Sequence, residues 1–232
     1  MERRSYLGAL VGSATVATAG CLGSLLEDEP EDVVLDPPDD QLLDSENLDY
    51  PAYGESLPLL ELPAPLSGDT VDAHALDRTA LITGFFAMCP AECGILLGQL
   101  AAVQERTIQH DLIDSTAFLP ITFDPERDDA EMLRENAELL GIDIDAGNWH
   151  YLRPETAADA EDVVQDRLGI EFDRVSDSDR VDHYDFEHIV VTLLVNPGGT
   201  VERAYRGERL DVDRVFGDVE TVIAAYDPEV HG

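Results

Sequence analysis

The chain has 232 residues, of which 44% are hydrophobic, so it can form one domain of ordinary size with a buried core. Its charge is extreme, because 50 Asp and Glu residues stand against 14 basic residues, all of them arginine, for a formal net charge of −36. Nucleic acid is excluded as a partner, since phosphate binding needs clustered basic side chains and the sequence has no such patch.

The acidic composition predicts a dependence on salt. Like charges destabilise the compact state in dilute buffer, whereas in molar salt the screening length shrinks to about 3 Å and the repulsion is largely screened. Acidic residues run through the amphipathic segments as well as through the N-terminal stretch. We therefore expect an extreme halophile as the source. The alternative is an acidic protein with a disordered tail.

The first residues are typical of an export signal. Arg3 and Arg4 form a twin-arginine pair, an apolar stretch of small residues covers 7–20, and the string TAGC ends at Cys21. The stretch is too short to span a bilayer comfortably, since a spanning helix needs about 20 apolar residues. We therefore predict a twin-arginine signal peptide with a lipobox over residues 1–21, with cleavage before Cys21 and a lipid on that residue.

This interpretation predicts a location. The domain would lie on the extracytoplasmic face of the cell membrane, lipid-anchored and exported by the twin-arginine route. The alternative is an uncleaved N-terminal anchor helix with an incidental cysteine. Residues 22–53 are rich in Asp, Glu and Pro without a sustained apolar period, so they are predicted to form an acidic disordered linker. The folded domain is then expected over residues 54–232.

Strands and helices alternate along this domain. In the first half we expect a hairpin around Ser67, Gly68 and Asp69, a buried strand at 80–87, a helix from Cys93 to about His110, a strand at 116–123 and a helix at 129–140 ended by Gly141. In the second half we expect a short strand at 149–152, a helix at 156–168 ended by Gly169, a buried strand at 189–195, a turn at 196–199, a strand at 200–205 and a helix at 212–226. This order predicts the α/β class: a thioredoxin-like sandwich with a central mixed β-sheet flanked by helices and an N-terminal hairpin.

Two cysteines and one histidine carry the chemistry that the sequence predicts. Cys89 closes an apolar run and Cys93 opens the next amphipathic stretch, so both sulfurs are expected where a strand turns into a helix. The macrodipole at a helix N-terminus favours thiolate, which improves metal binding and nucleophilicity. His188 comes just before a later buried strand. Two thiolates and an imidazole suit either a soft metal such as Cu(I) or a redox site.

The motifs resemble those of the Sco/SenC (PrrC) family of thioredoxin-fold copper chaperones. The resemblance extends over about 53–226 and rests on four strings in order: Cys89-Pro90-Ala91-Glu92-Cys93, Asp124-Pro125-Glu126-Arg127-Asp128, His188, and Asn196-Pro197-Gly198-Gly199. It implies a copper site made by Cys89, Cys93 and His188, with Cu(I) as the ion held and Cu(II) as a second state. It also implies a partner, cytochrome c oxidase subunit II or a related haem-copper oxidase, whose binuclear copper centre the chaperone helps to assemble.

The chain departs from the family's pattern beside the cysteines. Gly94 stands where the family usually has Pro, and Met88 stands where it commonly has Thr. Ala91 and Glu92 replace the family's more usual acidic and apolar order. None of these changes removes a ligand. Met88 is expected to pack in the core, because methionine often fills gaps there, although its thioether is also a candidate neighbour of the metal.

The cysteine pair has alternatives to copper binding. Cys89 and Cys93 could form a structural disulfide, as exported cysteine pairs often do. They could also cycle between dithiol and disulfide in a membrane-anchored thiol-disulfide oxidoreductase, which needs no histidine. A peroxidase is disfavoured because it needs an activating Thr and Arg beside its cysteine.

The remaining candidates are assigned mainly structural roles. His183 is a rival donor to His188, and the other histidines are expected at the surface: His74, His110, His150 and His231. We expect Asp124 near the site, Arg127 paired with nearby acids and Asp128 as the N-cap of the next helix.

Overall fold

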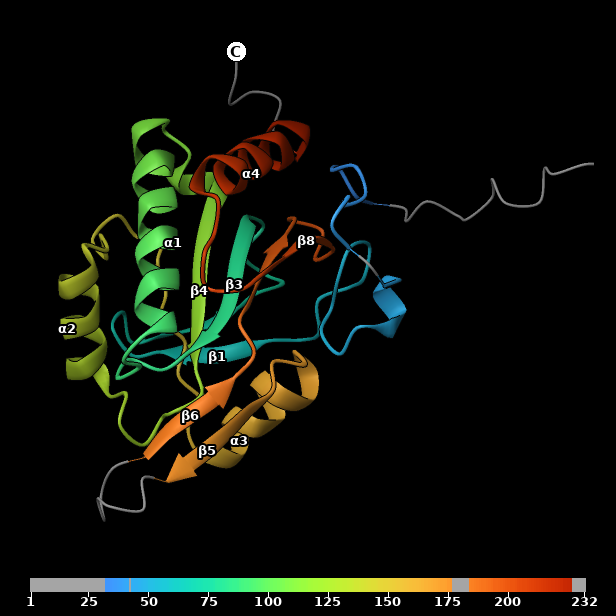
Figure 1. Cartoon of the computed structure of the whole chain (residues 1–232). Helices are drawn as coiled ribbons and strands as arrows, with labels where there is room; N and C mark the ends of the chain where they lie inside the picture. The colour runs from blue at the N-terminus through green and yellow to red at the C-terminus, as the bar shows by residue number, and fades with distance from the viewer. Residues whose placement is uncertain (1–31, 42, 177–183, 227–232) are drawn as a thin grey trace, which may run out of the picture.

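The computed structural model describes residues 32–41, 43–176 and 184–226 (Figure 1). The predicted signal peptide and Cys21 lie outside these residues, as do His183 and His231. None of the helices in the described part of the chain is long and apolar enough to cross a membrane.

The centre of the domain is a four-stranded mixed sheet. Its strands are β3 (Thr79–Phe85), β4 (Thr116–Thr122), β7 (Val191–Val195) and β8 (Val201–Arg206), in the order β4-β3-β7-β8. β3 and β4 run parallel, whereas β7 runs antiparallel to β3 and β8 antiparallel to β7. Every residue of β3, β4 and β7 is buried, which explains why these strands appear in the sequence as nearly continuous apolar runs.

Helices flank this sheet. They are α1 (Glu92–Gln109), α2 (Ala130–Leu140), α3 (Ala157–Ala160) with the π-helical segment η3 (Glu161–Arg167), and α4 (Val212–Tyr226). α1 packs against both α2 and α4 (Figure 1). η3 packs directly on β3, since a Cβ added to Gly84 would lie 3.3 Å from a methyl of Val164. The predicted thioredoxin-like sandwich is confirmed.

The predicted N-terminal hairpin is confirmed as well. β1 (Glu61–Ala64) and β2 (Asp69–Asp72) pair antiparallel. Gly68 lies in the turn between them with φ +81°, a backbone conformation that favours glycine.

Three predicted elements of the second half differ in the structure, and one hairpin was not predicted. Residues 149–152 form only two isolated bridges to β4, through Trp149 and Leu152, instead of a strand. The helix expected at 156–168 is a short α3 followed by η3, and the strand expected from residue 189 begins at Val191. A hairpin of β5 (Phe172–Ser176) and β6 (Tyr184–His188) was not predicted, because β6 has the half-exposed, acid-rich sequence YDFEH.

The acidic N-terminal stretch also differs from the prediction. Within the predicted linker, Leu35 is buried and Ala52 is fully buried, and a 3-10 turn, η1 (Ser45–Asn47), lies between them. The backbone of Asp49 contacts Gly169, where a Cβ would come within 1.7 Å of the Asp49 carbonyl oxygen. Parts of residues 32–53 thus pack on the domain.

Candidate metal centre

The two cysteines lie where β3 gives way to α1, as the sequence predicts. Cys93 is in the first turn of α1 and only 2% exposed, whereas Cys89, in the loop before it, is half-buried. The backbone N–H of Cys93 donates to the sulfur of Cys89 at 3.4 Å. The N-cap residue Ala91 offers no side-chain cap, so this sulfur satisfies one of the free N–H groups of the helix start.

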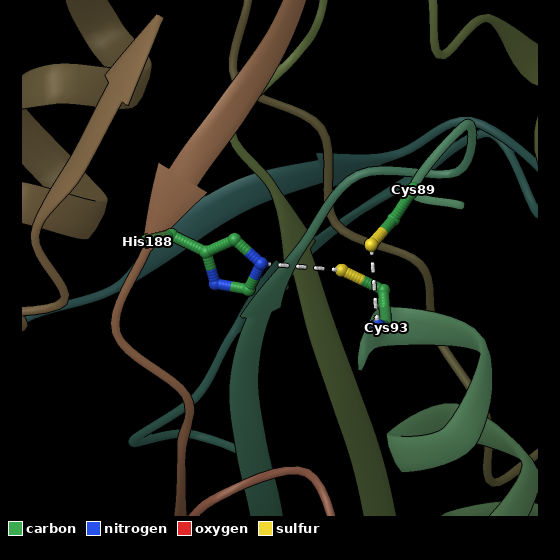
Figure 2. Close-up of side chains that lie close together, drawn as sticks. All are labelled: Cys89, Cys93 and His188. Carbon is green, nitrogen blue, oxygen red and sulfur yellow. Dashed lines mark hydrogen bonds between the residues drawn. The ribbon is translucent and has the colours of Figure 1, made fainter. Parts of the chain in front are cut away.

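His188 is the last residue of β6, and this strand places it beside the cysteines. Its Nε2 lies 3.6 Å from Sγ of Cys93, and a dashed line marks this contact in Figure 2. Its Nδ1 lies 3.0 Å from the carbonyl oxygen of Ile189, which can only accept. Nδ1 therefore keeps its proton in either protonation state, and loss of the Nε2 proton frees a lone pair that faces the sulfurs.

The three donor atoms form a compact group. Those of Cys89, Cys93 and His188 all lie within 4.8 Å of one another, the one such grouping of His, Cys, Asp or Glu in the part of the chain that the structure describes. Sulfur ligands bind a soft metal at about 2.3 Å, so three donors around one ion lie roughly 4 Å apart. Both cysteines are free thiols. The donor set and its spacing fit a copper ion.

The two thiols differ in acidity. The pKa of Cys89 is lowered to about 3, mainly because the Cys93 thiol donates a hydrogen bond to it. Burial opposes this effect, and hydrogen bonds from His188 and from backbone N–H groups add to it. The pKa of Cys93 is raised, because its proton is held by the Cys89 thiolate and because the side chain is buried. In the metal-free site, the half-buried Cys89 is therefore a thiolate and the buried Cys93 is a thiol.

The imidazole responds to the same thiolate. Burial lowers the pKa of His188, but hydrogen bonds to Cys89 and to the Ile189 carbonyl outweigh burial and raise it above its ordinary value. The aromatic rings of Phe123 and Phe86 wall the imidazole, with centroids 5.1 Å and 6.2 Å from it. The histidine is thus held by packing as well as by hydrogen bonds.

The strand that carries His188 is fixed at its other end. Tyr184, the first residue of β6, donates its hydroxyl to the buried carboxylate of Asp124 at 2.8 Å. Arg127 pairs with the same carboxylate, donates to the Tyr184 carbonyl at 2.9 Å, and stacks 3.7 Å from the Tyr184 ring centroid. The expected ion pairing of Arg127 is confirmed. Tyr184 was missed, because its role depends on a hairpin that the sequence did not reveal.

The expected cap of α2 was wrong by one residue. Asp129 accepts the N–H groups of Glu131 and Met132 and caps the helix. Asp128 is instead fully buried and accepts from the Ala87 N–H at 2.9 Å and from the Thr122 hydroxyl. Burial raises its pKa to about 6. Asp128 thus ties β4 to the loop that leads into Cys89.

Two further expectations, for Met88 and for the surface histidines, are also corrected. Met88 is 48% exposed, so it does not pack in the core. Of the histidines expected at the surface, His110 is exposed, whereas His74 and His150 are half-buried. Glu92, which breaks the family's usual order, places its carboxylate 3.8 Å from Sγ of Cys89.

The sequence matches the family model described as SCO1/SenC over residues 66–224, more than half of the chain. Solved structures share the fold. A SCO1/SenC family lipoprotein from Bacillus anthracis str. Ames is 16% identical, with a TM-score of 0.60 over 72% of this chain and 94% of that chain. ScoI from Arabidopsis thaliana, solved with copper bound, is 20% identical, with a TM-score of 0.59 over 72% of this chain and 98% of that chain.

A third structure is BsSco, described as a member of the Sco family of cytochrome c oxidase assembly proteins, in which a disulfide switch was identified. It is 19% identical, with a TM-score of 0.58 over 77% of this chain and 98% of that chain. At these identities the likeness establishes the fold. No curated protein matches the sequence.

Proposed function

The chain belongs to the SCO1/SenC family, and on that premise we propose that it is a copper chaperone that binds one copper ion through Cys89, Cys93 and His188. The observation that carries the proposal is the gathering of three soft donors within 4.8 Å by two cysteines of one loop and helix start and a histidine from a distant strand. A structural disulfide would not need the histidine. The copper-bound ScoI of Arabidopsis thaliana supports the same cargo.

The acidities of the donors suggest how copper enters and leaves. Cys89, the half-buried thiolate, meets the ion first, because it is both charged and accessible. Cys93 then loses its proton as it binds, and Nε2 of His188 completes a trigonal Cu(I) site. Delivery runs in reverse, with thiolates of the partner replacing these ligands one at a time. The imidazole is also an acceptable donor to Cu(II).

The partner in this proposal is subunit II of cytochrome c oxidase or a related haem-copper oxidase, whose binuclear copper centre the protein helps to assemble. BsSco is described as belonging to a family of oxidase assembly proteins, which supports this choice. The domain acts at the extracytoplasmic face of the membrane, tethered by a lipid on Cys21 after export by the twin-arginine route. The lipoprotein from Bacillus anthracis supports the anchor.

An anaerobic Cu(I) titration of the reduced mature chain in molar salt, against a competing chelator, tests the copper site. We expect one tightly bound copper per chain. Affinity should fall at least tenfold in each of the variants Cys89→Ser, Cys93→Ser and His188→Ala. His110→Ala, which changes an exposed histidine on α1's C-terminal side, is the control and should bind as the parent does. An unchanged Cu(I) affinity in His188→Ala would refute the proposed ligand set.

A thiol-disulfide oxidoreductase is the second candidate, and the low pKa of Cys89 favours it. In this reaction the Cys89 thiolate attacks a partner disulfide, and Cys93 then displaces the partner's thiol. The pair gives up two electrons and the Cys93 proton, water supplies the second proton, and the partner becomes a dithiol. His188→Ala should leave disulfide reduction within a few-fold of the parent yet abolish oxidase maturation. Maturation that survives in this variant would favour the oxidoreductase over the chaperone.

A further inference from the structure

Residues 32–41, which we call the strap, are held against β8 by a buried carboxylate. Glu202 is 0% exposed and accepts the backbone N–H of Val34 at 3.0 and 2.9 Å and that of Leu35 at 2.9 Å. Asn196 donates to Glu202 at 2.6 Å and, from the same amide nitrogen, to the Asp32 carbonyl at 2.9 Å. A buried carboxylate must be paired to be tolerated, so these contacts belong to the fold and fix the start of the strap.

Further contacts follow the strap along the same strand. Arg203 donates to the Asp36 carbonyl at 3.2 Å, and Arg206 donates to the Asp40 carbonyl at 2.7 Å. The contacts advance along β8 as the strap advances along the chain. β8 is an edge strand of the central sheet, and its side chains hold the strap beside it.

The strap begins at the end of the sheet opposite to the metal centre. Cys89 follows the last residue of β3, and β7 starts shortly after His188 and runs the other way. Val195, at the end of β7, pairs with Ala80 at the start of β3, and Asn196 comes next. In Figure 1 the dark blue strap reaches the domain high beside β8, whereas β3 points downward toward the first turn of α1. We call the two ends the anchor pole, at Asn196, and the site pole, at Cys89.

From this placement we infer that the strap orients the domain with the anchor pole toward the membrane. The site pole then faces a copper acceptor whose thiolates lie at a distance from the bilayer. The inference rests on the lipid anchor at Cys21 in the proposed function. Between residues 21 and 32 lie eleven peptide links, which reach at most about 40 Å. A domain of this size is itself about 40 Å across. The site pole can therefore meet the bilayer only if the tether is fully extended around the domain.

Without the strap the geometry would be different. The next contact with the domain then comes at Asp49, whose backbone lies against Gly169. A tether that reached to residue 49 would have 28 links and a span of about 100 Å, enough to turn the domain in any direction. The clamp at Glu202 thus decides both the reach and the orientation of the metal centre.

Hydrogen exchange on the mature chain in molar salt tests the clamp. We expect slow exchange of the Val34 and Leu35 amides, accelerated at least tenfold in Glu202→Gln. Glu135→Gln, a change at an exposed acid of α2, is the control and should leave both amides protected. Because Glu202→Gln risks unfolding, Arg206→Gln provides a second variant that touches only an exposed contact and should speed proteolysis within the strap. Unprotected amides in the parent would overturn the inference.

Energy transfer to lipids tests the orientation. The lipidated full-length protein is bound to phosphatidylcholine vesicles that contain an acceptor-labelled lipid, with a fluorophore on an azidophenylalanine at position 114 or 126. Asp114 and Glu126 are exposed and lie beyond opposite ends of β4, at the anchor and site poles. We expect stronger transfer from position 114, with the difference reduced in Glu202→Gln. Equal transfer in the parent, or a chain that does not bind vesicles, would overturn the orientation.

The copper titration separates this inference from the proposed function. Glu202 and Arg206 are not among the three donors, so Glu202→Gln and Arg206→Gln should bind Cu(I) as the parent does. Loss of copper binding in the parent would refute the function and leave the exchange result unaffected. Equal energy transfer with intact copper binding would refute only the orientation.

Discussion

At Cys89 a single sulfur accepts hydrogen bonds from a thiol, an imidazole and backbone N–H groups, which lowers its pKa to about 3. We predict that its alkylation by iodoacetamide in the metal-free reduced protein changes less than about twofold between pH 5 and 8. An ordinary thiol with a pKa of about 8.5 would slow roughly tenfold per pH unit over this range. Mass spectrometry of the modified peptide measures the rate. A tenfold fall from pH 7 to pH 6 would contradict the prediction.

The buried carboxylate of Asp128 makes stability depend on pH. Its folded pKa is raised to about 6 from 3.8, so the folded state keeps this proton longer than the unfolded state does. The contribution to stability is therefore full below about pH 4 and is lost as the pH rises through 6, by about 3 kcal/mol. One of its oxygens has no partner, and asparagine would remove the charge while keeping the oxygen that accepts from Ala87 and Thr122.

We therefore predict that Asp128→Asn flattens the fall in stability between pH 4 and 6 and raises the melting temperature at pH 8. Asp129→Asn is the matched control, because it retains a good helix cap and should change stability little at any pH. Thermal unfolding followed by circular dichroism in molar salt measures both. An Asp128→Asn variant with the parent's pH profile would show that the buried charge is not the cause.

At the scale of elements, β6 carries the proposed ligand His188 at one end and is fixed to the domain through Tyr184 at the other. The β5-β6 hairpin forms a sheet of its own, so side chains must hold it to the domain. Tyr184 and Arg127 meet on the Asp124 carboxylate, and Phe186 packs with Phe86 and Phe123. The position of His188 therefore depends on contacts made at the far end of its strand.

We predict that Tyr184→Phe weakens Cu(I) binding three- to tenfold, because the hydrogen bond to a buried carboxylate is lost and β6 is held less firmly. Alkylation of Cys89 should stay within twofold of the parent's rate, since the cysteine loop is untouched. Glu135→Gln, a change at an exposed acid of α2, is the control and should leave affinity unchanged. Equal affinities for Tyr184→Phe and the parent would show that the Tyr184 contact does not position His188.

For the whole molecule, the net charge of −36 dominates the response to salt. We predict that the melting temperature rises by more than about 10 °C between 0.1 M and 2 M NaCl, because self-repulsion is screened as the Debye length falls from about 10 Å toward 2–3 Å. A variant with ten exposed Asp and Glu residues changed to Asn and Gln should lose most of this dependence. Equal helical circular dichroism and melting in dilute buffer and in molar salt would refute it.

The sequence by itself determined the elements whose burial is simple. β3, β4 and β7 are buried on both faces and therefore appear as unbroken apolar runs, and Gly141 marks the end of α2 by its left-handed backbone. The two cysteines could be placed at a strand-to-helix turn because apolar patterns on either side identify both elements. The local sequence pattern was sufficient wherever residues close together in the sequence determine the element.

Only the tertiary structure decided the contacts between distant segments. β6 alternates half-buried and exposed residues, so nothing local separates it from a loop, and its pairing with β5 comes from the fold. Asp128 and Asp129 are chemically identical neighbours, and only the position of Thr122 and Ala87 selects the buried one. The acidic residues of the strap read as solvated linker, because the carboxylate that holds their backbone lies far along the chain, at Glu202. Such roles depend on contacts between residues that are far apart in the sequence and meet only when the chain folds.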